Sequence, residues 1–249
     1  MLGNVCIFLH VYDCNRTDNK YDNIPNWDEF LFEERLRNIM IRVVNVSKKY
    51  KDVEVVKNVS LDFESGKIYG LIGRNGSGKT VLMKCIAGFV IPTSGEIYYD
   101  ERKLGKDMDF APNTGVIIET PGFVGYQSAL ENLLGLASIR KKIDKNEVRE
   151  AIKLVGLDPD NKLRVGKYSL GMRQRLGIAQ AIMENPDVLI LDEPMNALDK
   201  DGVSDMRKLF LQLKEQGKTI LISSHNAEDI DVLCDYVWEM DKGEIKKIR

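Results

Sequence analysis

The sequence holds few cysteines, and those few are far apart. Cys6, Cys14, Cys85 and Cys234 are the only ones among its 249 residues. Their spacing does not fit a metal site, and four scattered thiols are too few for a disulfide framework. Such usage is typical of a protein from a reducing compartment. We therefore expect thiols without a structural or catalytic role.

Long hydrophobic runs are missing as well. The one early apolar run, residues 5–11 (VCIFLHV), is too short to span a bilayer. No basic segment stands in front of it, as a secretory signal would require. The lack of both signals predicts a soluble, cytoplasmic chain.

Neither sign of charge dominates the chain. It carries 36 Lys+Arg against 38 Asp+Glu, so no strong overall field attracts it to nucleic acid or to an anionic membrane. We therefore expect no nucleic-acid partner.

Residues 1–39 differ in composition from the rest. They hold seven acids against four bases, are rich in Asn and Asp, and show no clear hydrophobic period. We expect a flexible extension, or an artefact of the start site with Met40 as the natural start. A weak amphipathic anchor at residues 27–36 is the alternative. The folded domain is predicted to cover residues 40–249.

From residue 41 onward the pattern of apolar residues becomes regular. Residues 41–50 and 53–65 alternate and are rich in β-branched side chains, which predicts antiparallel strands. Later, short apolar runs alternate with helical segments, which indicates a mainly parallel sheet covered on both faces. These runs are residues 66–73, 114–119, 187–194 and 218–225.

Two helix starts lie between the second and third of these runs. The stretches S-A-L-E (residues 128–131) and D-K-N-E (residues 144–147) each place a capping residue three positions before a Glu. No strand pattern separates them. This predicts a helical subdomain at about residues 120–168.

The stretch G-R-N-G-S-G-K-T, residues 73–80, matches the phosphate-loop pattern G-x-x-x-x-G-K-[ST]. A strand pattern precedes it and a helix pattern follows, as the motif requires. The glycines allow backbone N–H groups to surround phosphates, Lys79 reaches the β and γ phosphates, and the Thr80 hydroxyl can bind Mg²⁺. A glycine-rich turn without a ligand is the weaker alternative.

Two consecutive acids, Asp192 and Glu193, end the apolar run at residues 187–194. Because neighbouring side chains of a strand point to opposite faces, both acids can serve one site only where the strand ends. We expect Asp192 in the Mg²⁺ shell and Glu193 at the attacking water, which it orients or deprotonates.

These motifs, with four more, resemble the nucleotide-binding subunit of ATP-binding cassette (ABC) transporters over residues 41–249. The four are Tyr50, S-L-G-M-R-Q at residues 169–174, N-A-L-D at residues 196–199, and S-S-H ending at His225. In family order they stand for the adenine-stacking aromatic, the signature motif, the D-loop and the switch histidine. Each alone has an ordinary structural explanation, and their joint order favours the family.

The resemblance implies an α/β fold of the P-loop NTPase type, with a mainly parallel core sheet, an antiparallel β subdomain and a helical subdomain. It implies an ATPase that uses ATP and Mg²⁺. The site residues implied are, for catalysis, Glu193, His225 and Lys79; for the metal, Thr80, Glu119 and Asp192; and for the nucleotide, Tyr50, Gly73, Asn75, Gly76, Ser77, Gly78, Lys79, Thr80, Val81, Ser169, Gly171 and Asp199.

The resemblance also implies a dimer of ATPase subunits, identical or different, joined head to tail. In the family, the signature helix of one subunit closes over the γ-phosphate held by the other. A helix N-terminus carries about half a positive charge and free N–H donors. Ser169 and Gly171 are thereby implied to complete the site of a second chain.

Two positions depart from the common family pattern. Glu119 stands where most members have a Gln that contacts Mg²⁺ and the attacking water, and S-L-G-M-R (residues 169–173) replaces the common Ser-Gly-Gly-Gln. Both departures resemble the ATPases of bacitracin-resistance and lantibiotic exporters. The resemblance implies export of a peptide antibiotic, lantibiotic or drug.

Transport then requires a separate integral membrane permease, which would hold the chain at the inner face of the cell membrane. In the family, a short helix of the permease docks on the helices before the signature. We predict residues 120–133 as this surface, with Phe123, Val124 and Tyr126 as apolar anchors. Two alternatives stay open: a soluble cassette ATPase acting on ribosomes or DNA, and a P-loop kinase.

Overall fold

The structure is a computed structural model in which residues 39–119 and 122–249 are described, with only the backbone described for Ile39. The predictions for residues 1–38 lie outside these residues, as do those for Thr120 and Pro121 in the expected docking surface. The described residues belong to one compact unit, Asn38–Arg249.

The first strands form an antiparallel sheet in the order β2-β1-β4-β5. In the second half of β2, Val59, Leu61 and Phe63 are buried, and the residues between them are exposed. This alternation is typical of a sheet with one face on the core, and it confirms the predicted antiparallel subdomain. The strands are β1 (Ile39–Tyr50), β2 (Val53–Glu64), β4 (Ser94–Tyr99) and β5 (Arg102–Lys103).

A second sheet forms the centre of the unit, in the order β10-β9-β3-β8-β7-β6. All neighbours pair in parallel except β9 and β10, which form a C-terminal hairpin. Every residue of β8 is buried, as expected of a parallel sheet covered on both faces. The strands are β3 (Ile68–Ile72), β6 (Thr114–Ile117), β7 (Val188–Asp192), β8 (Thr219–Ser223), β9 (Tyr236–Asp241) and β10 (Glu244–Lys247).

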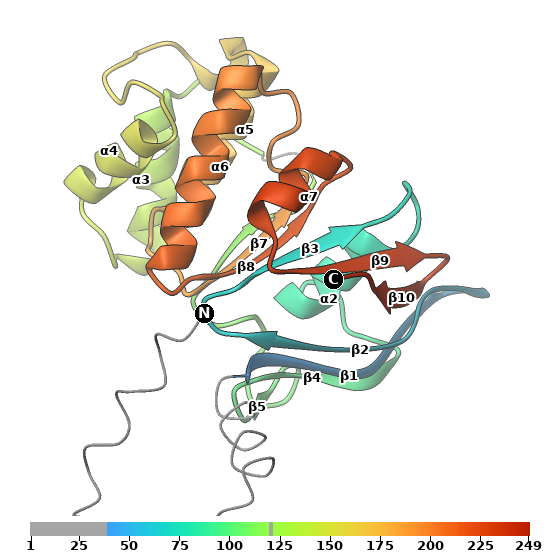
Figure 1. The fold of residues 1–249 in the computed structure, drawn as a ribbon. Coiled ribbons are helices and arrows are strands. Elements are labelled where there is room, and N and C mark those ends of the chain that lie inside the picture. Colours follow the sequence, from blue (N-terminus) through green and yellow to red (C-terminus); the bar gives the residue numbers. More distant parts are fainter. Residues whose placement is uncertain (1–38, 120–121) are drawn as a thin grey trace, which may run out of the picture. The chain divides into compact units, whose positions relative to one another are not determined.

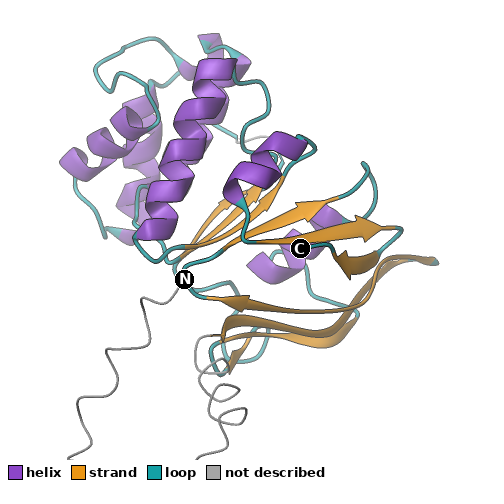
Figure 2. Cartoon of the chain, in the orientation of Figure 1, coloured by secondary structure: helices purple, strands orange, loops and turns teal. Residues whose placement is uncertain are grey.

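The two faces of the central sheet belong to two different cores. Ile220 and Ile222 of β8 pack in a core shared with the helices after β6. Leu221, between them, packs in a second core with the antiparallel sheet and α2 (Lys79–Ala87). Figures 1 and 2 show this layering, with α2 on the side of the antiparallel sheet and most other helices opposite.

Most helices lie where the sequence predicts them. Ser128 and Asp144 each form a complete capping box, with Glu131 and Glu147, so both predicted helix starts are confirmed. Helix α7 was not predicted. The helices on this side are α3 (Ala129–Arg140), α4 (Lys145–Leu154), α5 (Leu170–Ile182), α6 (Lys200–Glu215) and α7 (Ala227–Leu233), with a 3₁₀ turn η1 (Val165–Lys167). None of the helices in residues 39–119 and 122–249 is both long and apolar enough to cross a bilayer.

Candidate nucleotide site

The phosphate loop joins β3 to α2, and two of its glycines cannot be replaced without movement. Gly73 has φ 142°, and a Cβ there would lie 2.2 Å from the carbonyl oxygen of Met240. Gly78 has φ 112°, and its Cβ would lie 2.3 Å from the carbonyl oxygen of Val55. Gly76 at φ 78° faces open space. Glycines in the left-handed region allow a loop to form a concave cradle that fits a phosphate.

Polar atoms inside this loop are available to a ligand. The Lys79 side chain is 7% exposed, and its ammonium donates to the carbonyl oxygens of Gly73 at 2.7 Å and Arg74 at 3.1 Å. A lysine ammonium has three donors, so one is left for a phosphate. The buried Ser77 hydroxyl has no hydrogen-bond partner among the described residues, which also fits a polar ligand.

Oxygen ligands gather at the start of α2 and the end of β7. The Thr80 hydroxyl donates to Oδ2 of Asp192 at 2.6 Å. Ser223, which pairs with Asp192 in register, donates its hydroxyl to Oδ1 at 2.5 Å. A hydroxyl beside a carboxylate is the donor set that Mg²⁺ prefers. The residues present therefore fit the predicted metal, which the Thr80 hydroxyl and the Asp192 carboxylate would hold.

Glu193 is turned out of the strand by its backbone. Strand β7 ends at Asp192, and Glu193 has φ 50° in the left-handed region. Its Oε2 lies 2.9 Å from Nδ1 of His225. The His225 side chain is 69% exposed and that of Glu193 is 23% exposed. A carboxylate in contact with an imidazole at an open edge can accept a proton from water.

Three residues that the sequence analysis missed hold this pair in place. The Ser223 hydroxyl accepts from the Glu193 N–H at 2.9 Å, and Gln174 of α5 donates to the Pro194 carbonyl oxygen at 2.9 Å. Asp229 of α7 is 3% exposed and accepts from the Ser224 hydroxyl, the residue before His225, at 3.0 Å. Two of them had a signal in the sequence, since Ser223 opens the S-S-H motif and Gln174 ends the S-L-G-M-R-Q stretch. Asp229 acquires its role only through packing.

Glu119 does not join the Thr80–Asp192 group. Its Oε1 lies 2.5 Å from the ammonium of Lys84 on α2, and its φ is 63°.

Tyr50 ends β1 and is 46% exposed, with the Lys48 ammonium 5.1 Å from its ring centroid. Its ring therefore has free surface for stacking.

The signature and the D-loop lie against each other. Ser169 caps α5, where its hydroxyl accepts from the Met172 N–H at 3.1 Å. A Cβ on Gly171 would lie 2.9 Å from the carbonyl oxygen of Ala197. Asp199 caps α6 by accepting from the Gly202 N–H at 2.9 Å. Within the described residues, no hydrogen bond or ion pair joins Ser169, Gly171 or Asp199 to the phosphate loop.

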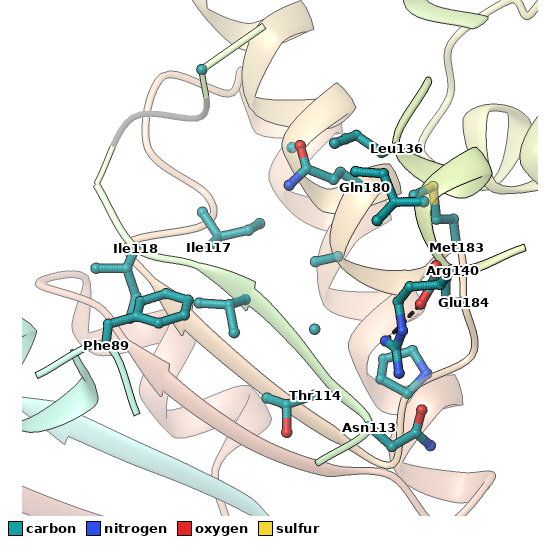
Figure 3. Close-up of a pocket in the computed structure, with 17 residues that line it drawn as sticks. Phe89, Asn113, Thr114, Ile117, Ile118, Leu136, Arg140, Gln180, Met183 and Glu184 are labelled. Carbon is teal, nitrogen blue, oxygen red and sulfur yellow. Dashed lines mark hydrogen bonds and ion pairs between the residues drawn. The ribbon is translucent and has the colours of Figure 1, made fainter. Parts of the chain in front are cut away.

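A groove of about 490 Å³ lies between β6, α3 and α5. Phe89, Ile118, Leu136 and Ile139 contribute apolar surface to its lining. Figure 3 shows Phe89 beside Ile118 on one side, and the Arg140–Glu184 ion pair on another, at 2.7 Å.

The predicted docking anchors are not part of this groove. Phe123 packs partly buried against the core. Val124 is 41% exposed and Tyr126 is 74% exposed, and neither lines the groove, to which their segment contributes Gly122.

The fold and the site together define a P-loop ATPase: a mainly parallel sheet, a glycine loop with an inward lysine, and a hydroxyl–carboxylate pair at the strand ends. The ABC transporter family model matches residues 56–196, and the chain belongs to this family. It is an ATP-binding and ATP-hydrolysing subunit of an ABC transporter. ABC subunits of this kind work with a membrane permease and associate with the membrane.

Relatives of known name align with most of the chain. The uncharacterized ABC transporter ATP-binding protein YybJ of Bacillus subtilis (strain 168) is 46% identical and aligns with 83% of this chain and 95% of its own length. The bacitracin transport ATP-binding protein BcrA of Enterococcus faecalis is 41% identical, and the alignment covers 83% of this chain and 68% of the length of BcrA. The lantibiotic transport ATP-binding protein SrtF of Streptococcus pyogenes is 35% identical, and the alignment covers 83% of this chain and 89% of SrtF.

Solved structures agree with the fold. The dimeric structure of MJ0796, a bacterial ABC transporter cassette, superposes with a TM-score of 0.74 at 26% identity, over 84% of this chain and 99% of that one. The α/β fold class with its parallel core sheet is thereby confirmed. The relatives named for transport do not favour the ribosome, DNA or kinase alternatives.

Proposed function

We propose that this chain is the ATPase subunit of an exporter of a peptide antibiotic, lantibiotic or drug. The observation that carries the ATPase role is the edge where Thr80 meets Asp192 and Glu193 meets His225, next to the phosphate loop. The substrate class is supported by the names of BcrA, for bacitracin transport, and SrtF, for lantibiotic transport. The direction of transport rests on the resemblance of Glu119 and the signature to exporters.

In this proposal the loop N–H groups and Lys79 hold the β and γ phosphates of ATP, and Tyr50 stacks on adenine. Asn75 and Val81 belong to the same loop and helix start and contact the nucleotide there. Thr80 and Asp192 hold Mg²⁺, with Glu119 as a further candidate ligand. The metal supplies positive charge that stabilises the charge developing on the phosphates.

Glu193 and His225 divide the remaining chemistry. The Glu193 carboxylate accepts the proton of the attacking water, because it is the acid that leaves the strand toward the open edge. His225 contacts the γ-phosphate and orients Glu193 through its 2.9 Å contact. Loss of the γ-phosphate removes that contact, so His225 reports which nucleotide is bound.

Ser169, Gly171 and Asp199 serve the ATP held by a second ATPase subunit, identical or different. Ser169 and Leu170 are exposed, and the N-terminus of a 13-residue helix offers free N–H donors to a phosphate. Two chains joined head to tail would then form two shared sites.

The membrane permease docks in the groove between β6, α3 and α5. Its rim carries exposed apolar side chains: Phe89 is 53% and Ile139 75% exposed. Ile118 lines the groove and precedes Glu119 in the chain, so a helix seated there would contact the segment that leads to Glu119. Docking would place the chain at the inner face of the cell membrane.

The test is to tag the chain in its native cell, solubilise the membranes gently and identify what co-purifies. We expect a polytopic membrane protein in comparable amount, lost in Ile139→Asp and kept in Leu154→Asp, a control at a 58% exposed position on α4 outside the groove. Both variants should hydrolyse ATP. Loss with Tyr126→Ala alone would move docking to the predicted segment. Recovery with ribosomes or DNA proteins instead would refute the transport role.

A further inference from the structure

Lys84 has no part in the mechanism above, yet it lies on the phosphate-loop helix. It follows Thr80 by four residues on α2, so the two side chains lie on the same face, about one turn apart. Its ammonium lies 2.5 Å from Oε1 of Glu119, and the two side chains are 27% and 66% exposed. Thr80 and Lys84 thus bring the acids of two different strands to one helix face.

The sheet places Glu119 at the same edge as the other two acids. Ile117 of β6 pairs with Leu191 of β7, so Asp192 follows this pair by one residue and Glu119 by two. At φ 63°, Glu119 has the left-handed backbone that also turns Glu193 out of β7. Three carboxylates therefore reach the edge that faces the phosphate loop.

Each of these acids has a different partner. Asp192 accepts hydrogen bonds from two neutral hydroxyls, and Glu193 contacts His225. Glu119 is the acid that has an ammonium within hydrogen-bond distance. A bound triphosphate adds negative charge here, and like charges repel. A neutral Gln at this position would need no such partner.

We propose that Lys84 is a positioning residue that offsets the charge of Glu119 and thereby makes a carboxylate at this position compatible with a bound triphosphate. The proposal rests on the proposed function, because it takes ATP to be bound in the phosphate loop. Lys84 acts through Glu119, so its contribution to ATP binding should disappear when Glu119 is made neutral.

The test is a double-substitution cycle read by ATP binding. The Kd for ATP is measured by calorimetry in EDTA for wild type, Lys84→Met, Glu119→Gln and the double variant. Without divalent metal, only cations of the protein can offset the carboxylate. When Glu119 is unchanged, we expect Lys84→Met to raise the Kd roughly three- to five-fold. In the Glu119→Gln background, we expect the same substitution to raise the Kd less than about 1.5-fold.

Two further variants separate charge from structure. Lys84→Arg keeps the charge and should bind ATP like wild type. Lys153→Met removes a similar exposed pair, Lys153–Glu150 at 2.7 Å on α4, and should leave the Kd unchanged. An equal loss from Lys84→Met in both backgrounds would overturn this proposal alone. Failure of the wild-type chain to bind ATP both in EDTA and with Mg²⁺ would overturn the proposed function together with it.

Discussion

At the level of single residues, backbone conformation decides which side chains reach the nucleotide site. Glu193 has φ 50°, a conformation that costs a non-glycine residue of order 1 kcal/mol or more. The hydrogen bond from its N–H to Ser223 and the bonds from Gln174 to the following carbonyls hold it there. The expectation that two consecutive acids share a site only at a strand end therefore has a geometric basis.

Glu193→Gln should bind ATP and fail to hydrolyse it. The amide is close in size to the carboxylate but cannot accept the proton of the attacking water. We expect at least about a hundred-fold lower kcat and an ATP-bound dimer in solution, detected by size-exclusion chromatography with light scattering. Normal turnover by this variant would remove Glu193 from its assigned role.

Cys85 and Cys234 should resist alkylation in the folded protein. Burial raises the pKa of the Cys85 thiol to about 11 and that of the Cys234 thiol to about 12. At pH 8, below both values, the thiols are neutral, and the thiolate is the reactive form. Peptide mass spectrometry after iodoacetamide treatment should find both cysteines unmodified in the absence of urea. When urea unfolds the protein, both should be modified. Rapid native labelling of either would contradict the described packing.

At the level of elements, close backbone contacts fix how α5 packs on the central sheet. A Cβ on Gly115 of β6 would lie 2.0 Å from the carbonyl oxygen of Ala181 on α5. The same strand and helix line the groove in Figure 3. This contact therefore sets the width of the groove as well as the packing of the core.

Gly115→Ala should lower the free energy of unfolding by about 1–3 kcal/mol, because the added methyl forces β6 and α5 apart. Gly135→Ala is the matched control: it lies inside α3, and beyond the neighbouring backbone of its own helix the added Cβ meets no atom within 4 Å. There alanine should raise the stability by about 0.5–1 kcal/mol. Urea denaturation midpoints measure both. Similar effects from the two substitutions would argue against this contact.

At the level of the whole molecule, two helix starts are proposed to bind phosphate, that of α2 and that of α5. Ser169 and Gly171 contact the D-loop and the start of α5, and no hydrogen bond among the described residues links them to the phosphate loop. In the proposed dimer, a second chain would supply the start of its α5 to each phosphate loop, because an exposed helix N-terminus is favourable next to a phosphate. The dimeric structure of the MJ0796 cassette shows that this fold can pair.

Mixing two inactive variants should restore ATP hydrolysis if the sites are shared. Lys79→Ala disables the phosphate loop, and Ser169→Arg blocks the signature. Each alone should be inactive, whereas an equal mixture forms mixed dimers with one complete site, which restores about a quarter of the wild-type rate. A mixture as inactive as its components would contradict the shared site, provided that affinity purification through a tag on one variant also recovers the other.

The sequence by itself determined the class of fold, the phosphate loop and the helix starts. These depend on short-range rules: glycine spacing in residues 73–78, capping boxes at Ser128 and Asp144, and apolar runs of strand length. They need no knowledge of distant contacts.

Tertiary structure alone decided which side chains meet. Lys84 and Glu119 are 35 residues apart, Gln174 and Pro194 are 20 apart, and the groove combines residues from β6, α3 and α5. Such pairs depend on strand order and on the packing of helices across the sheet. Spacing along the chain cannot reveal them, because side-chain contacts of this range are set by how whole elements pack.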